Sequence, residues 1–137
     1  MRIQSTSAEE TEAAGAGLAE RLRPGDLVLV SGDLGTGKTT FVRGAARALG
    51  VESPVTSPTF TIGQIYRSGE GLELAHIDLY RLDTLAGEDP ALLDDYVTPE
   101  RIAFVEWPGV GAPELPEPAA IVTISHEGGD RRSIEVA

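Results

Sequence analysis

The chain has 137 residues, of which 41% are hydrophobic and 24% charged, a composition typical of a globular domain with a buried core. Acidic residues outnumber basic ones by 22 to 11, and the resulting net charge of -11 opposes autonomous binding to a nucleic-acid backbone. The lack of cysteine excludes disulfides and thiol chemistry, and two histidines are too few for a His-rich zinc site. No apolar run suits a membrane helix and the first residues do not resemble a signal peptide, so we expect a cytoplasmic protein that does not associate with membranes.

The first half of the chain predicts two helices separated by a strand and a glycine-rich turn. Residues 7–10 (Ser-Ala-Glu-Glu) match a capping box, and the helical pattern that follows ends at the Pro-Gly pair 24–25. The apolar run 27–30 is typical of a strand that is buried on both faces. The glycine-rich residues 32–37 then lead into residues 39–49, whose apolar spacing predicts a helix.

The second half of the chain predicts mainly strands. Loops are expected at 53–58 and in the proline-rich residues 109–118, and the acidic residues 85–96 are expected to be irregular or helical. The predicted strands cover residues 59–66, 72–79, 102–105, 119–125 and 131–136. These elements predict a single α/β domain over residues 1–137, with a mixed, mainly parallel sheet, few helices and a C-terminal antiparallel hairpin.

Residues 32–39 match the phosphate-loop pattern G-x-x-x-x-G-K-[ST] without a gap. The glycines let backbone N–H groups surround a phosphate, and the helix that follows directs the positive end of its dipole at the same anion. Lys38, the only lysine in the chain, supplies a flexible charge for the β- and γ-phosphates, and the Thr39 hydroxyl can coordinate Mg²⁺. The chain contains no asparagine and therefore lacks the Asn-Lys-x-Asp loop of guanine-specific P-loop proteins, so we expect ATP rather than GTP.

Two carboxylates and one loop complete the candidate site. Sites for Mg-nucleotides usually place an acid at the end of a strand beside the phosphate loop. Glu106 follows the buried run 102–105, and Asp78 follows a more loosely alternating strand; either acid also fits a solvated strand end, and which one dominates at the metal stays open. Ser57 and Thr59 lie where many nucleotide switches sense the γ-phosphate, although both residues also fit a simple turn.

Four segments, in chain order, resemble the TsaE family, the ATPase component of bacterial tRNA threonylcarbamoyladenosine synthesis. They are Gly-Asp-Leu-Gly-Thr-Gly-Lys-Thr-Thr at 32–40, Ser-Pro-Thr-Phe-Thr at 57–61, His-Ile-Asp-Leu-Tyr-Arg-Leu at 76–82 and Val-Glu-Trp-Pro at 105–108. A phosphate loop alone is shared by many proteins, whereas this combination is specific. The resemblance covers nearly the whole chain and is weakest toward the C-terminal end.

The resemblance implies a P-loop ATPase that uses ATP and Mg²⁺, hydrolyses ATP weakly alone and acts with the TsaB–TsaD pair, which modifies tRNA. Contact with tRNA is then only indirect, through these partners. Catalytic roles are implied for Lys38, Asp78 and Glu106, metal binding for Thr39 and Glu106, and a switch-like loop for Ser57 and Thr59. The residues implied to bind the nucleotide are Thr11, Asp33, Leu34, Gly35, Thr36, Gly37, Lys38, Thr39, Thr40, Trp107 and Arg131.

Two other functions also fit a phosphate loop: a small P-loop kinase, and a nucleotide-dependent adaptor that does not hydrolyse ATP. A kinase needs an acceptor pocket and a closing lid, for which 137 residues leave little room. The sequence shows no convincing arginine finger, and Arg81 and Arg131 are the only candidates. A site that binds Mg-ATP but stabilises transition-state charge poorly favours an ATPase that depends on partners.

Overall fold

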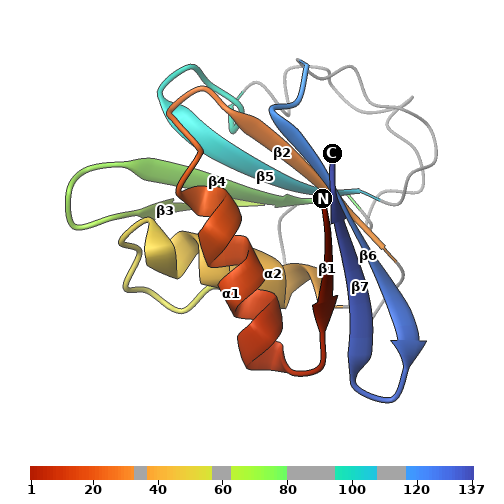
Figure 1. Ribbon diagram of the computed structural model, residues 1–137. Coiled ribbons are helices and arrows are strands. Elements are labelled where there is room, and N and C mark those ends of the chain that lie inside the picture. The colour runs from red at the N-terminus through yellow and green to blue at the C-terminus, as the bar shows by residue number, and fades with distance from the viewer. Residues whose placement is uncertain (33–36, 57–62, 80–94, 108–116) are drawn as a thin grey trace.

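The computed structural model describes residues 1–32, 37–56, 63–79, 95–107 and 117–137 (Figure 1). The elements in chain order are β1 (Arg2–Ser5), α1 (Ala8–Ala19), β2 (Leu27–Ser31), α2 (Lys38–Ala48), β3 (Gly63–Arg67), β4 (Glu73–Asp78), β5 (Arg101–Trp107), β6 (Ala120–Gly128) and β7 (Arg131–Val136). The predictions for the acidic segment up to residue 94, for most of the proline-rich loop and for Arg81 fall outside the described residues.

These seven strands form one sheet in the order β1-β7-β6-β2-β5-β4-β3. The four central strands β6, β2, β5 and β4 are mutually parallel, while the pairs β1–β7, β6–β7 and β3–β4 are antiparallel. The predicted mixed sheet with a C-terminal hairpin is confirmed, and its parallel part is the centre. The carboxyl ends of the central strands meet at one edge, which is where open α/β sheets bind ligands.

The sequence prediction missed β1, whose residues (Arg-Ile-Gln-Ser) contain no apolar run. This strand depends on pairing with the far end of the chain, since Arg2 lies opposite Glu135 and Ser5 opposite Arg132. The two termini consequently lie side by side (Figure 1). The Met1 amine donates a hydrogen bond to the backbone carbonyl of Val136 at 2.8 Å. Long-range pairing of this kind leaves no periodic signal in a segment of four residues.

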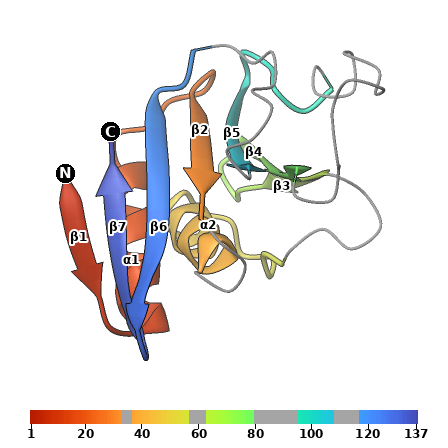
Figure 2. The same ribbon diagram turned by 90° about the vertical axis from the view of Figure 1, so that its right-hand side faces the viewer.

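Both helices cover the same face of the sheet (Figures 1 and 2). The core on that face includes Leu18, Phe41, Val42, Ala45, Val28, Val30, Phe104, Val122 and Ile134. The opposite face buries Leu27, Leu29, Ala75, Ile77, Leu79, Ala103 and Val105, against which Tyr96 and Val97 pack. The run Leu-Val-Leu-Val of β2 is therefore buried on both faces, as predicted. No helix in the described ranges is long and apolar enough to cross a membrane.

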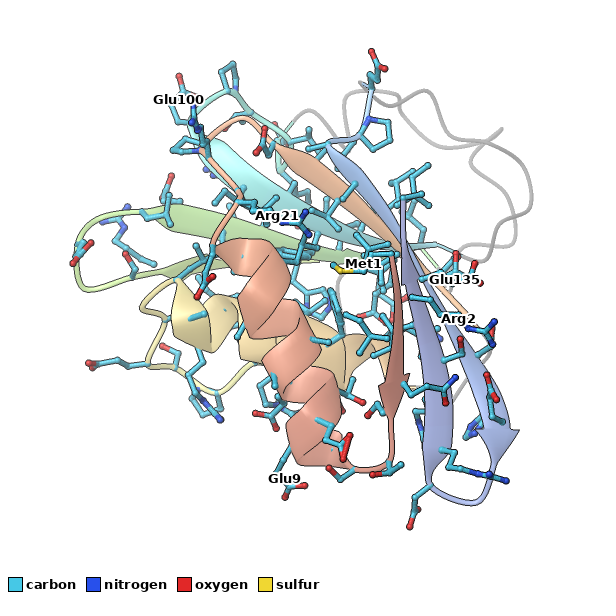
Figure 3. All side chains as sticks on the ribbon, viewed as in Figure 1. Met1, Arg2, Glu9, Arg21, Glu100 and Glu135 are labelled. Atoms are coloured by element: carbon cyan, nitrogen blue, oxygen red, sulfur yellow. The ribbon has the colours of Figure 1, made fainter. Side chains whose placement is uncertain are left out.

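The first turn of α1 is held by the predicted cap. The Ser7 hydroxyl accepts from the Glu10 backbone N–H at 3.1 Å. The carboxylate of Glu10 turns back to Thr6 instead of Ser7, and accepts from the Thr6 hydroxyl at 2.6 Å and from its N–H at 3.3 Å. Glu9 in the same turn points away from the body of the protein (Figure 3), at the end of the helix where an acidic side chain favours the dipole.

Glu73 ties three strands together at the amino end of β4. Arg67 on β3 donates to its Oε2 at 3.0 Å, and Arg101 on β5 donates to its Oε1 at 3.3 Å. The hydrogen bond from Arg67 is the main cause that holds the pKa of Glu73 below its usual range, with Arg101 adding to it and burial opposing both. The carboxylate therefore stays ionised at neutral pH and links the edge strand β3 to the parallel centre.

A hollow of about 280 Å³ lies at the amino end of β6, between the end of α1 and the two chain termini. Figure 3 labels two of the residues that line it, Met1 just before β1 and Arg21 just beyond α1. The lining residues are Met1, Leu18, Arg21, Leu22, Ala119, Ala120, Val136 and Ala137.

The two helices touch backbone to backbone at two glycines. A Cβ atom added at Gly15 of α1 would lie 2.1 Å from the carbonyl oxygen of Phe41, and one added at Gly44 of α2 would lie 2.0 Å from the carbonyl oxygen of Glu12. Neither position accepts a side chain unless the helices move apart. Gly17, also on α1, is exposed and has no atom within 4 Å of its added Cβ.

We predict opposite effects of the same substitution at two glycines of α1. Gly15→Ala should lower the free energy of unfolding by about 3 kcal/mol or more, because the new methyl meets a backbone that cannot rotate away. Gly17→Ala should raise it by about 0.5–1 kcal/mol, because alanine is the better helix former and nothing obstructs it. Urea unfolding monitored by circular dichroism measures both values, and equal midpoints for the two variants would contradict the close helix contact.

Candidate nucleotide site

The candidate site lies at the carboxyl edge of the parallel strands, on the face covered by α2. β2 ends at Ser31 and α2 begins at Lys38 (Figure 2), one residue before the predicted start of this helix. Glu106 is the penultimate residue of β5, and Asp78 is the last residue of β4. The order of strand, glycine-rich segment and helix is as predicted, and both predicted carboxylates reach the same edge.

Lys38 is almost completely buried in the first turn of α2, with 6% of its surface exposed. Its Nζ donates to the backbone carbonyl of Gly32 at 2.8 Å, so the side chain reaches back toward the end of β2. Gly37, which precedes the helix, has a φ angle of +105°, in the left-handed region that a side chain disfavours. The Gly37 carbonyl accepts from the Phe41 N–H at 2.9 Å and thereby starts the helix.

Glu106 receives two side chains on one oxygen. The Thr39 hydroxyl donates to Glu106 Oε2 at 3.1 Å, and His76 Nε2 is hydrogen-bonded to the same oxygen. Glu106 is 3% exposed and His76 is fully buried. A carboxylate oxygen accepts hydrogen bonds, so this contact is satisfied by the tautomer of His76 that carries its proton on Nε2. The other ring nitrogen, Nδ1, is buried with no hydrogen-bond partner among the described residues.

Asp78 lies next to Glu106 in the sheet. The parallel register of β4 and β5 pairs the two residues directly, and Asp78 is 8% exposed. Alternation along β4 places Asp78 on the same face as His76, the face that α2 covers. Of the two carboxylates that the sequence left as candidates for the metal, Glu106 is the one that is hydrogen-bonded to Thr39.

The first helix brings Thr11 to the glycine-rich segment. Thr11 is 2% exposed, and its Oγ1 lies 2.7 Å from the hydroxyl oxygen of Ser5. A Cβ added at Gly37 would lie 3.7 Å from Thr11 Cγ2 and 3.7 Å from Arg132 Nε. Thr11 and Arg132, which come from opposite ends of the chain, therefore flank Gly37.

The sequence analysis gave Arg131 as a nucleotide residue and did not include Arg132, the arginine that lies beside Gly37. Arg131 is exposed at the start of β7, and alternation along the strand directs the side chain of Arg132 to the opposite face. Arg132 shares its face with Ile134, which packs in the core beneath the helices. The alternation that buries Ile134 was the available signal, because it selects Arg132 for the helix-covered face. Nucleotide binding by Arg131 stays a prediction.

Only some of the other residues predicted to bind the nucleotide lie in the described part of the chain. Thr40 is half-buried in the first turn of α2. Trp107 ends β5, directly after Glu106, and pairs with Ser31 of β2. The predicted site residues Asp33, Leu34, Gly35, Thr36, Ser57 and Thr59 lie outside the described residues.

The oxygen atoms of Thr39 and Glu106 suit a Mg²⁺ ion that is bound partly by the protein and partly by the phosphates of a substrate. Within the described part of the chain, no group of three or more histidine, aspartate or glutamate side chains could hold a metal ion. Thr39 and Glu106 supply two hard oxygen atoms 3.1 Å apart. Mg²⁺ usually takes only one or two protein carboxylates and keeps water and substrate phosphates as its other ligands. The residues present therefore fit a Mg-nucleotide rather than a resident metal.

The fold and the site define an α/β protein of the P-loop class, with its phosphate-loop helix after a central parallel strand and an acid on the neighbouring strand. The family described as "Threonylcarbamoyl adenosine biosynthesis protein TsaE" matches residues 5–134. The chain belongs to this TsaE family, which is a family of P-loop-type, ATPase-like proteins.

Several curated relatives carry the name tRNA threonylcarbamoyladenosine biosynthesis protein TsaE. The protein from Bacillus subtilis is 38% identical over 134 residues, covering 98% of this chain and 83% of its own length. The Streptomyces coelicolor protein is 43% identical over 85% of this chain and 79% of its own, and the Treponema pallidum protein is 35% identical over the full length of both. A crystal structure of Bacillus subtilis YdiB matches with a TM-score of 0.75 and 35% identity, covering 98% of this chain and 82% of that one.

We predict that Thr39 and Glu106 are energetically coupled before any nucleotide binds. In a double-mutant cycle with Thr39→Val and Glu106→Gln, the coupling energy should be about 1 kcal/mol or more, because each substitution weakens the same charge-assisted hydrogen bond. Thr40→Val is the matched control, since it makes the same change one residue further along α2. Urea unfolding of the four proteins of each cycle gives the coupling, and equal values for Thr39 and Thr40 would contradict the prediction.

Proposed function

We propose that the protein is an ATPase of tRNA threonylcarbamoyladenosine biosynthesis, which binds Mg-ATP and hydrolyses it in association with the TsaB–TsaD pair in the cytoplasm. The observation that carries this proposal is the Thr39–Glu106 hydrogen bond beside the buried Lys38, at the carboxyl edge of the parallel strands. Family membership and the names of the relatives support the pathway.

The role proposed for each side chain follows from its charge and from its position at the carboxyl edge of the sheet. Lys38 binds the β- and γ-phosphates, because its ammonium group reaches back from α2 to the carbonyl of Gly32, the first residue of the phosphate-loop pattern. Thr39 and Glu106 hold Mg²⁺, whose charge, when bound, offsets the charge that develops on the transferred phosphoryl group. Asp78 supports hydrolysis from the neighbouring strand, as its burial beside Glu106 allows.

Further residues are proposed to contact the nucleotide. Thr11 and Arg132 are proposed as nucleotide residues because both lie beside Gly37. Ser57 and Thr59 are proposed to sense the γ-phosphate. The family pattern adds residues 33–36, Thr40, Trp107 and Arg131 as further nucleotide contacts.

The proposed partners explain how so acidic a chain serves a tRNA pathway. A net charge of -11 disfavours direct contact with tRNA phosphates, so the TsaB–TsaD pair is proposed to hold the RNA. The same pair is proposed to complete the ATPase site, by adding a positive group or by ordering the loop that contains Thr59. ATP hydrolysis by this chain alone is accordingly expected to be slow.

We predict that the two consecutive arginines of β7 differ in their contribution to ATP affinity. Arg132→Gln should weaken ATP binding, because Arg132 lies beside Gly37. The expected loss of affinity is about tenfold, which corresponds to one charge-assisted hydrogen bond. Arg131→Gln should weaken ATP binding less, since its side chain starts on the other face of the strand. Calorimetric titration with Mg-ATP measures both affinities, and the reverse order would assign the nucleotide contact to Arg131.

We predict slow ATP hydrolysis alone and clear stimulation by the TsaB–TsaD pair. Asp78→Ala should bind ATP but lose the stimulated rate, whereas Lys38→Ala should lose tight ATP binding altogether. Glu100→Ala is the control, because it removes an exposed carboxylate at the amino end of β5 (Figure 3), opposite to the site. Phosphate release is measured for each protein with and without the pair.

The outcomes of this assay separate the three functions that a phosphate loop allows. Equal wild-type rates with and without the pair would contradict the proposed coupling. Complex formation that depends on nucleotide but is unaffected when hydrolysis is blocked would indicate an adaptor. Transfer of phosphate to an acceptor other than water would indicate a kinase.

A further inference from the structure

His76 is the buried group for which the proposed function has no role. The ring lies fully buried on β4, two residues before Asp78, on the face that α2 covers. Its Nε2 is hydrogen-bonded to Glu106, while Nδ1 has no partner among the described residues. A leucine or phenylalanine fills such a position without burying an unpaired nitrogen, so packing alone does not account for histidine here.

The contact with Glu106 depends on the register of two parallel strands. His76 pairs with Phe104 across β4 and β5, and Glu106 follows Phe104 by two residues on the same face. The glutamate carboxylate therefore lies one step closer to the carboxyl edge than the imidazole. Thr39 of α2 donates to the oxygen that His76 also contacts, so strand and helix hold Glu106 Oε2 together. No hydrogen bond within the described part of the chain engages Oε1.

A rigid donor matters at this position because glutamate is flexible. A glutamate side chain has several rotatable bonds, and an acid that must hold a metal binds more weakly if it has to be ordered first. Groups that hydrogen-bond a metal-binding carboxylate or histidine commonly contribute 10- to 100-fold to metal affinity without touching the metal. The imidazole of His76 is a stiff ring held in the sheet, and it reaches Glu106 without approaching the surface.

We propose that His76 is a positioning residue: its Nε2–H holds the carboxylate of Glu106 against the Thr39 hydroxyl and so preorganises the two protein oxygens assigned to Mg²⁺. This inference rests on the proposed function, because it takes Glu106 as a metal residue. His76 itself contacts neither metal nor nucleotide. Its effect should appear in the Mg²⁺ dependence of nucleotide affinity and not in nucleotide binding without metal.

The test compares two replacements of His76 that differ in one donor group. The amide nitrogen of glutamine takes roughly the place of Nε2 and still donates, whereas leucine fills the space and donates nothing. Affinity for a non-hydrolysable ATP analogue is titrated at one pH in EDTA and over a series of Mg²⁺ concentrations. Phe104→Leu is the packing control, since it loosens the core beside His76 and leaves the hydrogen bonds of Glu106 in place.

In His76→Leu, the Mg²⁺ concentration that gives half of the affinity gain should rise about 10- to 100-fold, with affinity in EDTA unchanged within about twofold. His76→Gln should recover most of this loss, and Phe104→Leu should resemble the wild type. Equal Mg²⁺ dependence for His76→Leu and His76→Gln, or a loss in Phe104→Leu as large as in His76→Leu, would overturn the positioning role. If His76→Leu does not fold, His76→Gln alone tests the positioning role. The proposal then requires His76→Gln to show the Mg²⁺ dependence of the wild type, and a weaker Mg²⁺ effect contradicts it.

Glu106→Gln separates the inference from the proposed function. The inference requires this variant to lose the Mg²⁺ effect. If it does and His76→Leu does not, the metal site stands and His76 has no role in it. If Glu106→Gln keeps the full Mg²⁺ effect, the proposed metal site is wrong and the role of His76 falls with it.

Discussion

The contact between α1 and α2 is the constraint on which the rest of the structure depends. Helix axes usually stay 8–10 Å apart because side chains separate them. Here Gly15 and Gly44 leave no room for side chains, and the backbones meet. This proximity brings the first turn of α1 to the start of α2, so that the buried hydroxyl of Thr11 lies beside Gly37. A helix that covers the sheet thereby also forms one wall of the candidate site, at Gly37.

The parallel centre of the sheet supplies the other wall. Parallel strands point their carboxyl ends at one edge, so Asp78 and Glu106 lie next to each other although they are 28 positions apart in the sequence. β2 delivers the glycine-rich segment to the same edge, and α2 returns from there across the strands that carry the acids. The hydrogen bond between Thr39 and Glu106 then joins the helix to the sheet. The candidate site residues and the fold share the same contacts here. Thr11, Lys38, Asp78 and Glu106 are accordingly buried.

Local patterns predicted most of the fold and much of the candidate site. The run 27–30, the cap at Ser7 and the C-terminal hairpin are each encoded by neighbouring residues, and each was predictable from propensity and period. β1 was missed because only its pairing with β7 makes it a strand. Arg132 was not predicted, because the face of β7 on which it lies depends on strand alternation after a bulge in the β6–β7 ladder. The role of His76 was out of reach, because a contact with Glu106 across two strands requires the register to be known.

Charge explains why a site of this form would need a metal. Two nearly buried carboxylates, Asp78 and Glu106, share an edge with one buried lysine in a chain of net charge -11. Charges that are shielded from water interact more strongly than exposed ones, so the acids oppose the approach of bare phosphates more than their number suggests. Among the described residues, Lys38 and the half-buried Arg132 only balance these two carboxylates, so they leave no net positive charge for a polyphosphate. A divalent cation that arrives with the nucleotide converts Glu106 from an opposing charge into a binding group, and a partner protein can add the positive charge that the transition state still requires. If the proposed function is correct, the carboxylates at this edge explain why ATP must arrive with a metal ion and why a partner must complete the site.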